Sequence, residues 1–415
     1  MPRIRARSPA DGCSGSTGSR RCSRSAAART RCSATSSASW ATACRGSERR
    51  DVRPAPTPEQ EELKQAIREF CAREVTQERL LAWESADGDA TDGLRRAIAE
   101  LGWLGLGLPA SAGGSDASLV DVAVALQECA RGLLPRSLVG AIRGAVALAA
   151  VAPESADVRG LAAGERALAL ALDEESGGTP GAFVTRIETR DGKPCVTGVK
   201  HYVPDAGAAL HLVAAREGSG ASLVLVEADG ACVVRDALRS FGGDQQAHVR
   251  YEAAPVRARL TPAGEGAEAL ARLRRQQSAL ALAEMIGGME AVLEMTVAYV
   301  KEREQFGQKI ALFQAVRHQI AEMGMRFTAA RHLAWQAITR VSGGCEQGHE
   351  LASALAYVGQ AFKQLCWTGH HLHGGAGFVV EHRLRFHSER AQSLCVRYAP
   401  EAPALAEIAN ALLGK

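Results

Sequence analysis

The spacing of apolar residues predicts helices in the first folded part of the chain. From residue 54 to residue 165, apolar positions recur at the spacing of one helix face. Thr57 suits the N-cap of the first helix, Pro58 its first helical position, and Gln60 the second half of a capping box. We therefore predict an N-terminal helical domain over residues 54–165.

Short runs of β type replace the helical spacing in the middle of the chain. They include ALALAL, SLVLVEADG and AHVRYEAAPVRARL, and the long apolar stripes of both flanks are missing there. Asp191 and Gly192 form a hairpin signal between two of these runs. We predict a central antiparallel β domain over residues 166–260.

Helical spacing then returns and continues to the C-terminus. The apolar residues between Met285 and Val300 form one stripe at helical spacing. Further helices are predicted over Phe313–Val341, Gln347–His370 and Pro403–Leu413. Because antiparallel helices of this kind form four-helix bundles, residues 261–415 are predicted to be a C-terminal helical bundle domain. The expected fold class is α+β, with the domains in the order α, β, α.

The first 53 residues have a different composition. They are rich in Arg, Ser and Ala, and their apolar surface is too small to offset the entropy of ordering, so we expect disorder. A start that is rich in Arg and Ser and poor in acids resembles an organelle transit peptide, although it lacks the apolar core of a secretory signal. A wrongly assigned start codon in a GC-rich gene explains the same composition, and we favour this second interpretation.

The overall composition excludes several classes of function. The formal net charge of the 415 residues is only +3, and no basic patch is interleaved with aromatic residues, so no nucleic acid partner is expected. No apolar run is long enough to cross a bilayer. The cysteines after residue 53 are scattered singly, which suits a reducing compartment. We expect a cytoplasmic protein.

Candidate chemistry first appears in YVKEREQFGQKIALFQAVRHQIAEM, which runs from Tyr299 to Met323. An arginine in a loop between two helices, here Arg303, can pair with a pyrophosphate through two hydrogen bonds. Gln305 and Gln314 can offer amides to a cofactor, and Phe306 an apolar face. Taken alone, Arg303 is more often a solvated charge at a helix end, and only the joint pattern favours the functional interpretation.

A second candidate segment is HLHGGAGFVVE, from His371 to Glu381. Gly374, Gly375 and Gly377 remove side chains where a backbone has to pass close to a bulky group. A glycine helix cap explains one of these glycines but not all of them. Glu381 follows as a single carboxylate, a residue type that is most often a plain surface charge after a turn.

Together these segments resemble the two signatures of the acyl-CoA dehydrogenase family. The first signature reads Arg-x-x-Phe-Gly, then Ile, Phe-Gln and His; the second reads Gln-x-x-Gly-Gly-x-Gly-Phe/Tyr-x-x-Glu. The matching residues of the first are Arg303, Phe306, Gly307, Ile310, Phe313, Gln314 and His318, and His371 replaces the glutamine of the second. The Glu-His pair after the turn also resembles a branch that includes actinobacterial dehydrogenases of steroid side chains and other bulky acyl-CoA substrates. Several members of that branch work as paired, non-identical subunits.

The resemblance implies a flavin enzyme that dehydrogenates an acyl-CoA thioester. Arg303 would reach the FAD diphosphate of a neighbouring subunit, and the glycine turn the adenosine diphosphate part. Tyr202 and Val203 would lie behind the flavin ring. Glu381 would remove the α proton while the β hydride leaves for flavin N5, a step that suits a carboxylate in a dry pocket. A dimer or tetramer and an electron-transfer flavoprotein as acceptor are also implied.

Several positions depart from the family pattern. Asp173, in LDEESGGTP, replaces a threonine that contacts flavin and thioester, and Pro204 replaces another threonine behind the flavin. The family's Gly-Thr after the last long helix is not evident in SLCVRYAPEAP. Some members carry the base on an earlier helix, but the matching segment here has Gln276 and Gln277 and no acid. Two alternatives therefore stay open: a flavin-poor structural partner subunit of a heteromeric dehydrogenase, and a related acyl-CoA oxidase.

Histidines around the glycine turn raise the question of a metal site. Imidazoles are common zinc ligands, but the spacing here matches no standard zinc motif and no cysteine pair accompanies it. The histidines concerned are His370, His371, His373, His382 and His387. We predict no metal.

Overall fold

The N-terminal helices begin at the cap that the sequence predicts. In the computed structural model, which describes residues 56–85, 91–175, 183–344 and 349–413, the Thr57 hydroxyl accepts the Gln60 N–H at 3.2 Å. The Gln60 side chain accepts the Thr57 N–H at 3.1 Å in return. The predicted capping box is confirmed. The helices that follow are α2 (Pro58–Glu74), α3 (Gln77–Ser85), α4 (Asp92–Glu100), η1 (Trp103–Gly105), η2 (Ala110–Ala112), α5 (Leu119–Arg131), α6 (Arg136–Val151) and α7 (Ala156–Ala162).

The middle of the chain forms one sheet that closes on itself. Its strands are β1 (Leu168–Ala171), β2 (Arg186–Arg190), β3 (Lys193–Pro204), β4 (Leu210–Glu217), β5 (Gly220–Glu227), β6 (Val233–Leu238) and β7 (Gln246–Arg259). The pairs β4–β5, β5–β7, β7–β3 and β3–β2 are antiparallel, and a single pairing of β2 with β4 completes the ring. Asp191 and Gly192 have φ of 49° and 74° and join β2 to β3, which confirms the predicted hairpin.

The prediction of an antiparallel sheet needs a correction, because two pairings, β1 with β4 and β2 with β4, are parallel. β1 pairs with β4 in parallel, with Leu168 opposite Leu210. The chain enters the sheet from α7, and β1 also packs on α6, where a Cβ on Gly144 would come within 2.4 Å of the Leu168 carbonyl oxygen. The helical layer therefore fixes the position of β1, and the period-2 pattern of a strand carries no information on its direction.

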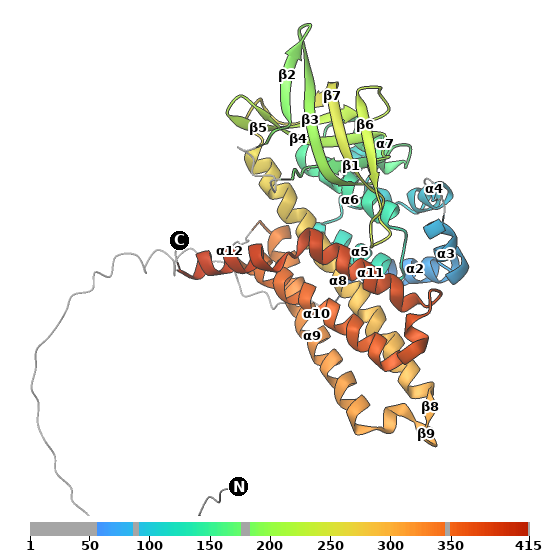
Figure 1. Ribbon diagram of the computed structural model, residues 1–415. Helices are drawn as coiled ribbons and strands as arrows, with labels where there is room; N and C mark the ends of the chain where they lie inside the picture. The colour runs from blue at the N-terminus through green and yellow to red at the C-terminus, as the bar shows by residue number, and fades with distance from the viewer. Residues whose placement is uncertain (1–55, 86–90, 176–182, 345–348, 414–415) are drawn as a thin grey trace, which may run out of the picture. The chain divides into compact units, whose positions relative to one another are not determined.

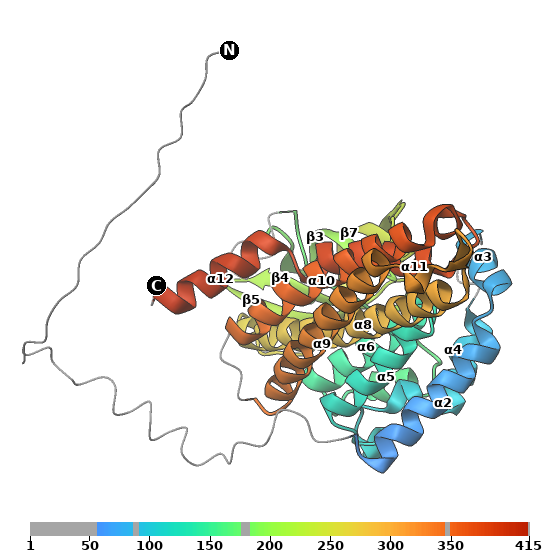
Figure 2. The same ribbon diagram turned by 90° about the horizontal axis from the view of Figure 1, so that it is seen from below.

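The C-terminal part is a bundle of long helices. The elements are α8 (Ala267–Glu302), β8 (Glu304–Gln305), β9 (Gln308–Lys309), η4 (Ile310–Leu312), α9 (Gln314–Ser342), α10 (His349–His373), η5 (Gly374–Phe378), α11 (Arg383–Tyr398) and α12 (Glu401–Leu413). α8, α9, α10 and α11 pack on one another, so the predicted four-helix bundle is confirmed (Figure 1). α5 packs along α8 and joins the N-terminal helices to the bundle (Figure 2).

Some predictions fall on residues outside the described ranges. They concern the first 53 residues, most of the segment from Leu172 to Pro180, and the first residues of the helix predicted from Gln347. Along the part of the chain that is described, no helix combines the length and the apolar character needed to span a bilayer. Cys71, Cys129, Cys195, Cys232, Cys366 and Cys395 are free thiols.

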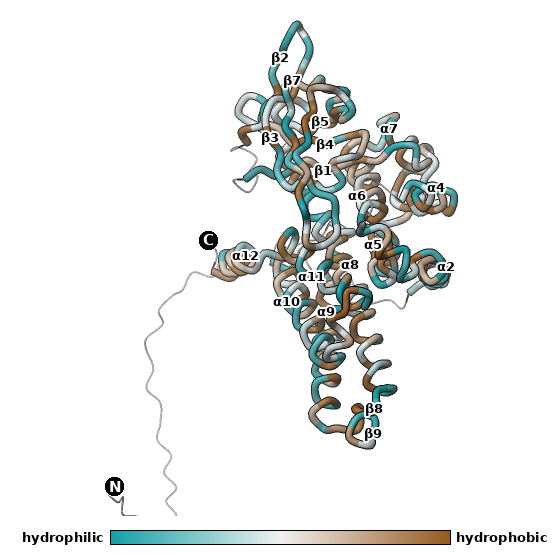
Figure 3. Tube along the Cα trace, turned by 45° about the vertical axis from the view of Figure 1, so that its right-hand side comes forward, coloured by the Kyte–Doolittle hydropathy of each residue, from teal (hydrophilic) through white to brown (hydrophobic). Residues whose placement is uncertain are grey.

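The structure has two hydrophobic cores. The inside of the closed sheet holds small and β-branched residues such as Val196, Val213 and Val249, while the larger core joins the helices to the other face of the sheet, which contributes Leu168 and Leu210. The β2–β3 hairpin extends away from both and is hydrophilic at its tip (Figure 3). Lys200, fully buried on β3, donates to Glu174 at 2.8 Å, and burial lowers the pKa of this lysine to about 8. This pair fixes the backbone that follows β1.

We expect replacement of glycine by alanine to have opposite effects on stability at two positions of the bundle. In α8, a Cβ on Gly287 would come within 2.0 Å of the Gln127 carbonyl oxygen of α5, so Gly287→Ala should destabilise the protein by about 1–3 kcal/mol. In α9, a Cβ on Gly324 meets nothing within 4 Å, so Gly324→Ala should stabilise by about 0.5–1 kcal/mol. Thermal unfolding of both variants tests this, and equal midpoints would contradict the close packing of α5 on α8.

Candidate functional site

The first group of predicted cofactor residues lies at the end of α8. Arg303 caps this helix, Gln305 ends β8, Phe306 lies in the β8–β9 turn, and Gln314 begins α9. All four side chains are exposed, and Phe306 is 91% exposed with a φ of 55°. The structure thus gathers these residues on one solvent-facing end of the bundle.

The glycine turn is tied to the same end of α8. The Tyr299 hydroxyl donates to the carbonyl oxygen of His373 at 3.2 Å, and the two rings stack with centroids 4.4 Å apart. Tyr299 also accepts the N–H of Arg303 at 2.9 Å through its carbonyl oxygen. Because Tyr299 contacts both segments, the two sequence motifs lie side by side although about seventy residues separate them.

The three glycines of the turn have three different explanations. Gly374 has a φ of 57°, a conformation that favours glycine. Gly377 packs on its own chain, since a Cβ there would come within 2.8 Å of the His373 Cβ. Gly375 has no positive φ, and a Cβ there would meet nothing within 4 Å. Only Gly375 is left unexplained by the chain's own structure, so its bare backbone is the feature that fits an external group.

An open pocket lies beside the glycine turn, and we call it the turn pocket. Its volume is about 760 Å³, in the range of small-molecule sites. Its lining combines aromatic rings with polar groups and includes Phe241, Lys363, Trp367, His371, Gly375 and Phe378. Trp367 is 74% exposed, and Phe241 and Phe378 are each 71% exposed. Flat apolar faces and one ammonium group suit an aromatic ligand that carries negative charge.

Glu381 lies in the turn between η5 and α11. Its side chain is exposed, it does not line the turn pocket, and no hydrogen bond or ion pair joins it to another described residue. The neighbours Val379 and Val380 are 48% and 59% exposed. The described residues therefore leave the Glu381 side chain open to solvent and form no dry pocket around it.

The second group of predicted cofactor residues lies far from the first. Tyr202 and Val203 end β3, on the side of the sheet that meets α11. Gln277, which lies near this meeting point, and Tyr299 are both on α8, 22 residues and therefore about 33 Å apart. One chain does not bring the two groups together, which agrees with the implied role of Arg303 at a neighbour's flavin.

Tyr202 and Val203, expected behind the flavin ring, already make contacts within the chain. The Tyr202 carbonyl oxygen already accepts a hydrogen bond from Arg397 at 2.9 Å, and Val203 is 1% exposed. The Tyr202 ring is 55% exposed and packs edge-on against His248. The bond from Arg397 joins the end of β3 to α11.

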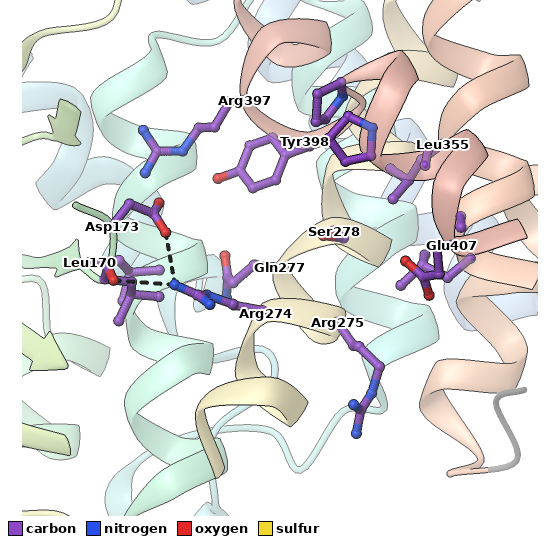
Figure 4. A pocket seen from close by; sticks show the side chains of 16 residues that line it. Leu170, Asp173, Arg274, Arg275, Gln277, Ser278, Leu355, Arg397, Tyr398 and Glu407 are labelled. Carbon is purple, nitrogen blue, oxygen red and sulfur yellow. Dashed lines mark hydrogen bonds and ion pairs between the residues drawn. The ribbon is translucent and has the colours of Figure 1, made fainter. Parts of the chain in front are cut away.

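A second pocket opens where β1, α8, α10, α11 and α12 meet, and we call it the junction pocket (Figure 4). Its volume is about 320 Å³. On its polar side, Arg274 donates to Asp173 at 3.0 Å and to the Leu172 carbonyl oxygen at 3.3 Å. Tyr398 faces it from the end of α11, and Leu355 lies on the opposite, apolar side. Asp173, which replaces the family's threonine, is thus committed to an ion pair.

A buried polar network fills the interior next to the junction pocket. Arg143 of α6 donates to the Gln277 side chain at 2.9 Å, to the Gln277 carbonyl oxygen at 2.7 Å and to Glu284 at 2.5 Å. Its guanidinium also lies 4.5 Å from the centroid of the Tyr398 ring. Arg136 adds an ion pair with Glu284 at 3.6 Å. The cavity that remains here is about 40 Å³, which is too small for an acyl group.

Sequence reasoning missed this network, although a signal was present. Arg143 and Glu284 each interrupt an apolar helical run, AIRGAVALAA and ALALAEMIGG. A charge on the buried face of a helix requires a partner, and these two charges are opposite. Their separation of 141 positions hides the pairing in the sequence.

The histidines around the turn make separate contacts and do not converge on one point. His370 bonds to the Ser388 hydroxyl at 2.7 Å, His382 accepts the Leu384 N–H at 3.2 Å, and His387 is buried in α11. His371 is exposed on the last turn of α10. Among the described residues, no three His, Cys, Asp or Glu side chains converge as a metal site requires.

Comparison with known proteins gives consistent matches. Residues 57–155 match the family model described as acyl-CoA dehydrogenase, N-terminal domain, and residues 264–396 match the one described as acyl-CoA dehydrogenase, C-terminal domain. Acyl-CoA dehydrogenase IpdE2 of Mycobacterium tuberculosis is 26% identical over 354 residues, which cover 81% of this chain and 92% of the relative. The 3-sulfinopropanoyl-CoA desulfinase of Paraburkholderia xenovorans is 27% identical over 304 residues, 68% of this chain and 78% of the relative.

A solved structure named for the Tcur3481–Tcur3483 steroid ACAD superimposes with a TM-score of 0.78. It is 27% identical in sequence and covers 87% of this chain and 99% of its own. The three-part architecture is therefore common to this chain and that protein.

We expect the buried network to depend on its carboxylate. Glu284→Gln leaves the buried guanidinium group of Arg143 without an anion, so the variant should lose about 3–5 kcal/mol of stability. Glu322→Gln is the matched control, because Glu322 pairs with Arg326 on the exposed face of α9 and contributes at most about 1 kcal/mol. Denaturant unfolding of both variants measures the difference, and equal losses would show that the network is not buried.

Proposed function

The chain belongs to the acyl-CoA dehydrogenase family, and from this premise we propose that it takes part in the FAD-dependent α,β-dehydrogenation of an acyl-CoA thioester as one subunit of an oligomer. Members of this family are flavoproteins and oxidoreductases that act on CH–CH bonds. The observation that carries the proposal is Gly375, whose bare backbone faces open space beside the turn pocket and the Arg303 loop.

The exposed end of α8 offers the donors that a flavin dinucleotide needs. The Arg303 guanidinium can pair with the pyrophosphate, and the amides of Gln305 and Gln314 and the His371 ring can donate to its polar edges. Gly374 and Gly375 leave room for the adenosine diphosphate part. When bound, FAD accepts the hydride; the residues of this chain bind and orient it.

Exposed apolar groups on the same end favour assembly with another subunit. Phe306 is 91% exposed, Leu312 61% and Trp367 74%. Apolar surface of this kind is rarely left in water, and it marks an interface. The proposed assembly is a dimer or tetramer of identical or related chains; the solved relative named for Tcur3481 and Tcur3483 supports the second form.

Glu381 is the proposed base for the α proton. In the single chain it is exposed, so the role requires a neighbouring subunit to exclude water from it. The exposed Phe378, Val379 and Val380 flank it and would be buried by the same contact. Electrons would pass from reduced flavin to an electron-transfer flavoprotein; transfer to oxygen, as in an oxidase, would instead give stoichiometric peroxide.

A second candidate function is favoured by the closed interior. Arg397 donates to the Tyr202 carbonyl oxygen, and Arg274 pairs with Asp173. The cavity beside Arg143 has a volume of only about 40 Å³. These contacts support a structural partner subunit that offers its exposed end to the flavin of another chain and holds no flavin ring of its own. This second form of the proposal leaves all of these contacts in place.

We expect Gly375→Leu to reduce flavin binding without loss of stability. The new side chain would enter the open space of the turn pocket, and its Cβ would meet no heavy atom within 4 Å. Flavin absorbance per chain should fall at least about tenfold, the effect of about 1.4 kcal/mol, in the purified oligomer. Gly230→Leu, another open position on the sheet domain, serves as the control. Unchanged flavin content in Gly375→Leu would overturn the proposed cofactor surface.

Glu381→Gln separates the two candidates. If Glu381 is the base, the variant keeps its flavin but loses substrate-driven bleaching by about 10²–10⁴-fold. Glu268→Gln, on the exposed start of α8, should bleach normally. Normal bleaching by Glu381→Gln in a complex with a homologous chain would exclude Glu381 as the base and favour the partner subunit.

A further inference from the structure

Three histidines surround the glycine turn and have no part in the proposed function. His370 and His373 lie in the last turns of α10, and His382 is the N-cap of α11. The rings of His373 and His382 are 5.0 Å apart, and His370 lies 4.8 Å from the ring of Phe378. The backbone from Gly374 to Glu381 therefore runs between imidazole rings.

Two of the rings donate a proton to a fixed acceptor. His373 donates through Nδ1 to the Gly369 carbonyl oxygen at 2.8 Å. Ser388 donates its hydroxyl proton to the Leu384 carbonyl oxygen at 3.1 Å, so His370 must be the donor in its 2.7 Å bond to that hydroxyl. Each bond selects one neutral tautomer of the ring.

The third ring acts as an acceptor. His382 Nδ1 accepts the N–H of Leu384 at 3.2 Å and so caps α11, which is possible only while this nitrogen carries no proton. The remaining nitrogen of His373, Nε2, is buried and has no hydrogen-bond partner among the described residues. A proton on that nitrogen would be a buried donor without an acceptor.

The surroundings of the cluster disfavour positive charge. Burial lowers the pKa of His370 and of His373, and burial followed by repulsion from those two rings lowers the pKa of His382. Within the described residues, no carboxylate or guanidinium shifts the pKa of any of the three. From α8, the titratable group in contact is Tyr299, which stacks on His373.

We infer that the neutral forms of His370, His373 and His382 position the glycine turn, and that protonation of this cluster releases the turn together with the start of α11. Unfolded histidine takes up its proton near pH 6.5, at about its ordinary pKa. Because the folded pKa values are lower, the full stability of the turn is present above about pH 6.5 and falls as the pH drops towards those values. In that range, the equilibrium constant for opening of the turn rises by up to about tenfold per pH unit for each histidine.

Release of the turn would move Gly375 and Glu381 together. That consequence for flavin binding depends on the proposed function, whereas the opening of the turn does not. A test on the flavin-free chain therefore separates the opening of the turn from the binding of flavin. If the turn does not open in acid, the proposed function is unaffected. If the chain does not bind flavin, the inference about the turn is unaffected.

Amide hydrogen exchange of the full chain at about pH 7.5 and pH 5.5 tests the inference, with rates corrected for the intrinsic pH dependence of exchange. Protection of residues 374–386 should fall at least about tenfold at the lower pH, while α5, which contains no histidine, keeps its protection. The same protection at both pH values, or an equal loss in α5, would overturn the inference.

Two replacements locate the effect. His373→Phe keeps a ring on Tyr299 but cannot take up a proton, and His382→Asn keeps an acceptor for the Leu384 N–H. Each should shrink the acid-induced loss of protection by up to about tenfold. His332→Phe, an exposed histidine of α9, should leave that loss unchanged. If one variant fails to fold the other decides, and a full acid response in a folded variant of either kind counts against the cluster.

Discussion

The guanidinium of Arg143 fixes how the helical parts of the molecule meet. It donates to three acceptors on α8, stacks on the last aromatic ring of α11, and belongs itself to α6. A buried pair of this kind adds little net stability over an apolar core, but it tolerates no other arrangement, because each misplaced charge would be left without a partner. The relative position of α6, α8 and α11 follows from this one side chain.

That arrangement decides which parts of the chain are open to ligands. The interior beside Arg143 is filled, and the space between β3 and α11 is bridged by Arg397. The opposite end of α8 carries exposed aromatic residues, a bare glycine backbone and an open pocket of about 760 Å³. The chain thus presents its binding surface outward, as a subunit does when a partner completes the site.

α8 connects these two regions. It is 36 residues long, about 54 Å at 1.5 Å per residue, with Gln277 and Glu284 at the filled interior and Tyr299 under the glycine turn. Gly287 brings it against α5 between the two. A rigid helix of this length gives the turn a fixed support, while the histidines on α10 and before α11 give it a support that depends on their protonation.

The sequence by itself determined the elements that rest on local rules. The Thr57 cap, the Asp191–Gly192 hairpin and the order of helical, β and helical stretches are all set by neighbours within a few positions. The two motifs were also readable, because each is a short run of unusual residue types. Only the tertiary structure decided that β1 is parallel to β4, that Gly375 is the unexplained glycine and that Glu381 is exposed. The same holds for Arg143 and Glu284, which meet across 141 positions. Such contacts depend on how distant surfaces pack, and no local pattern of side chains encodes that.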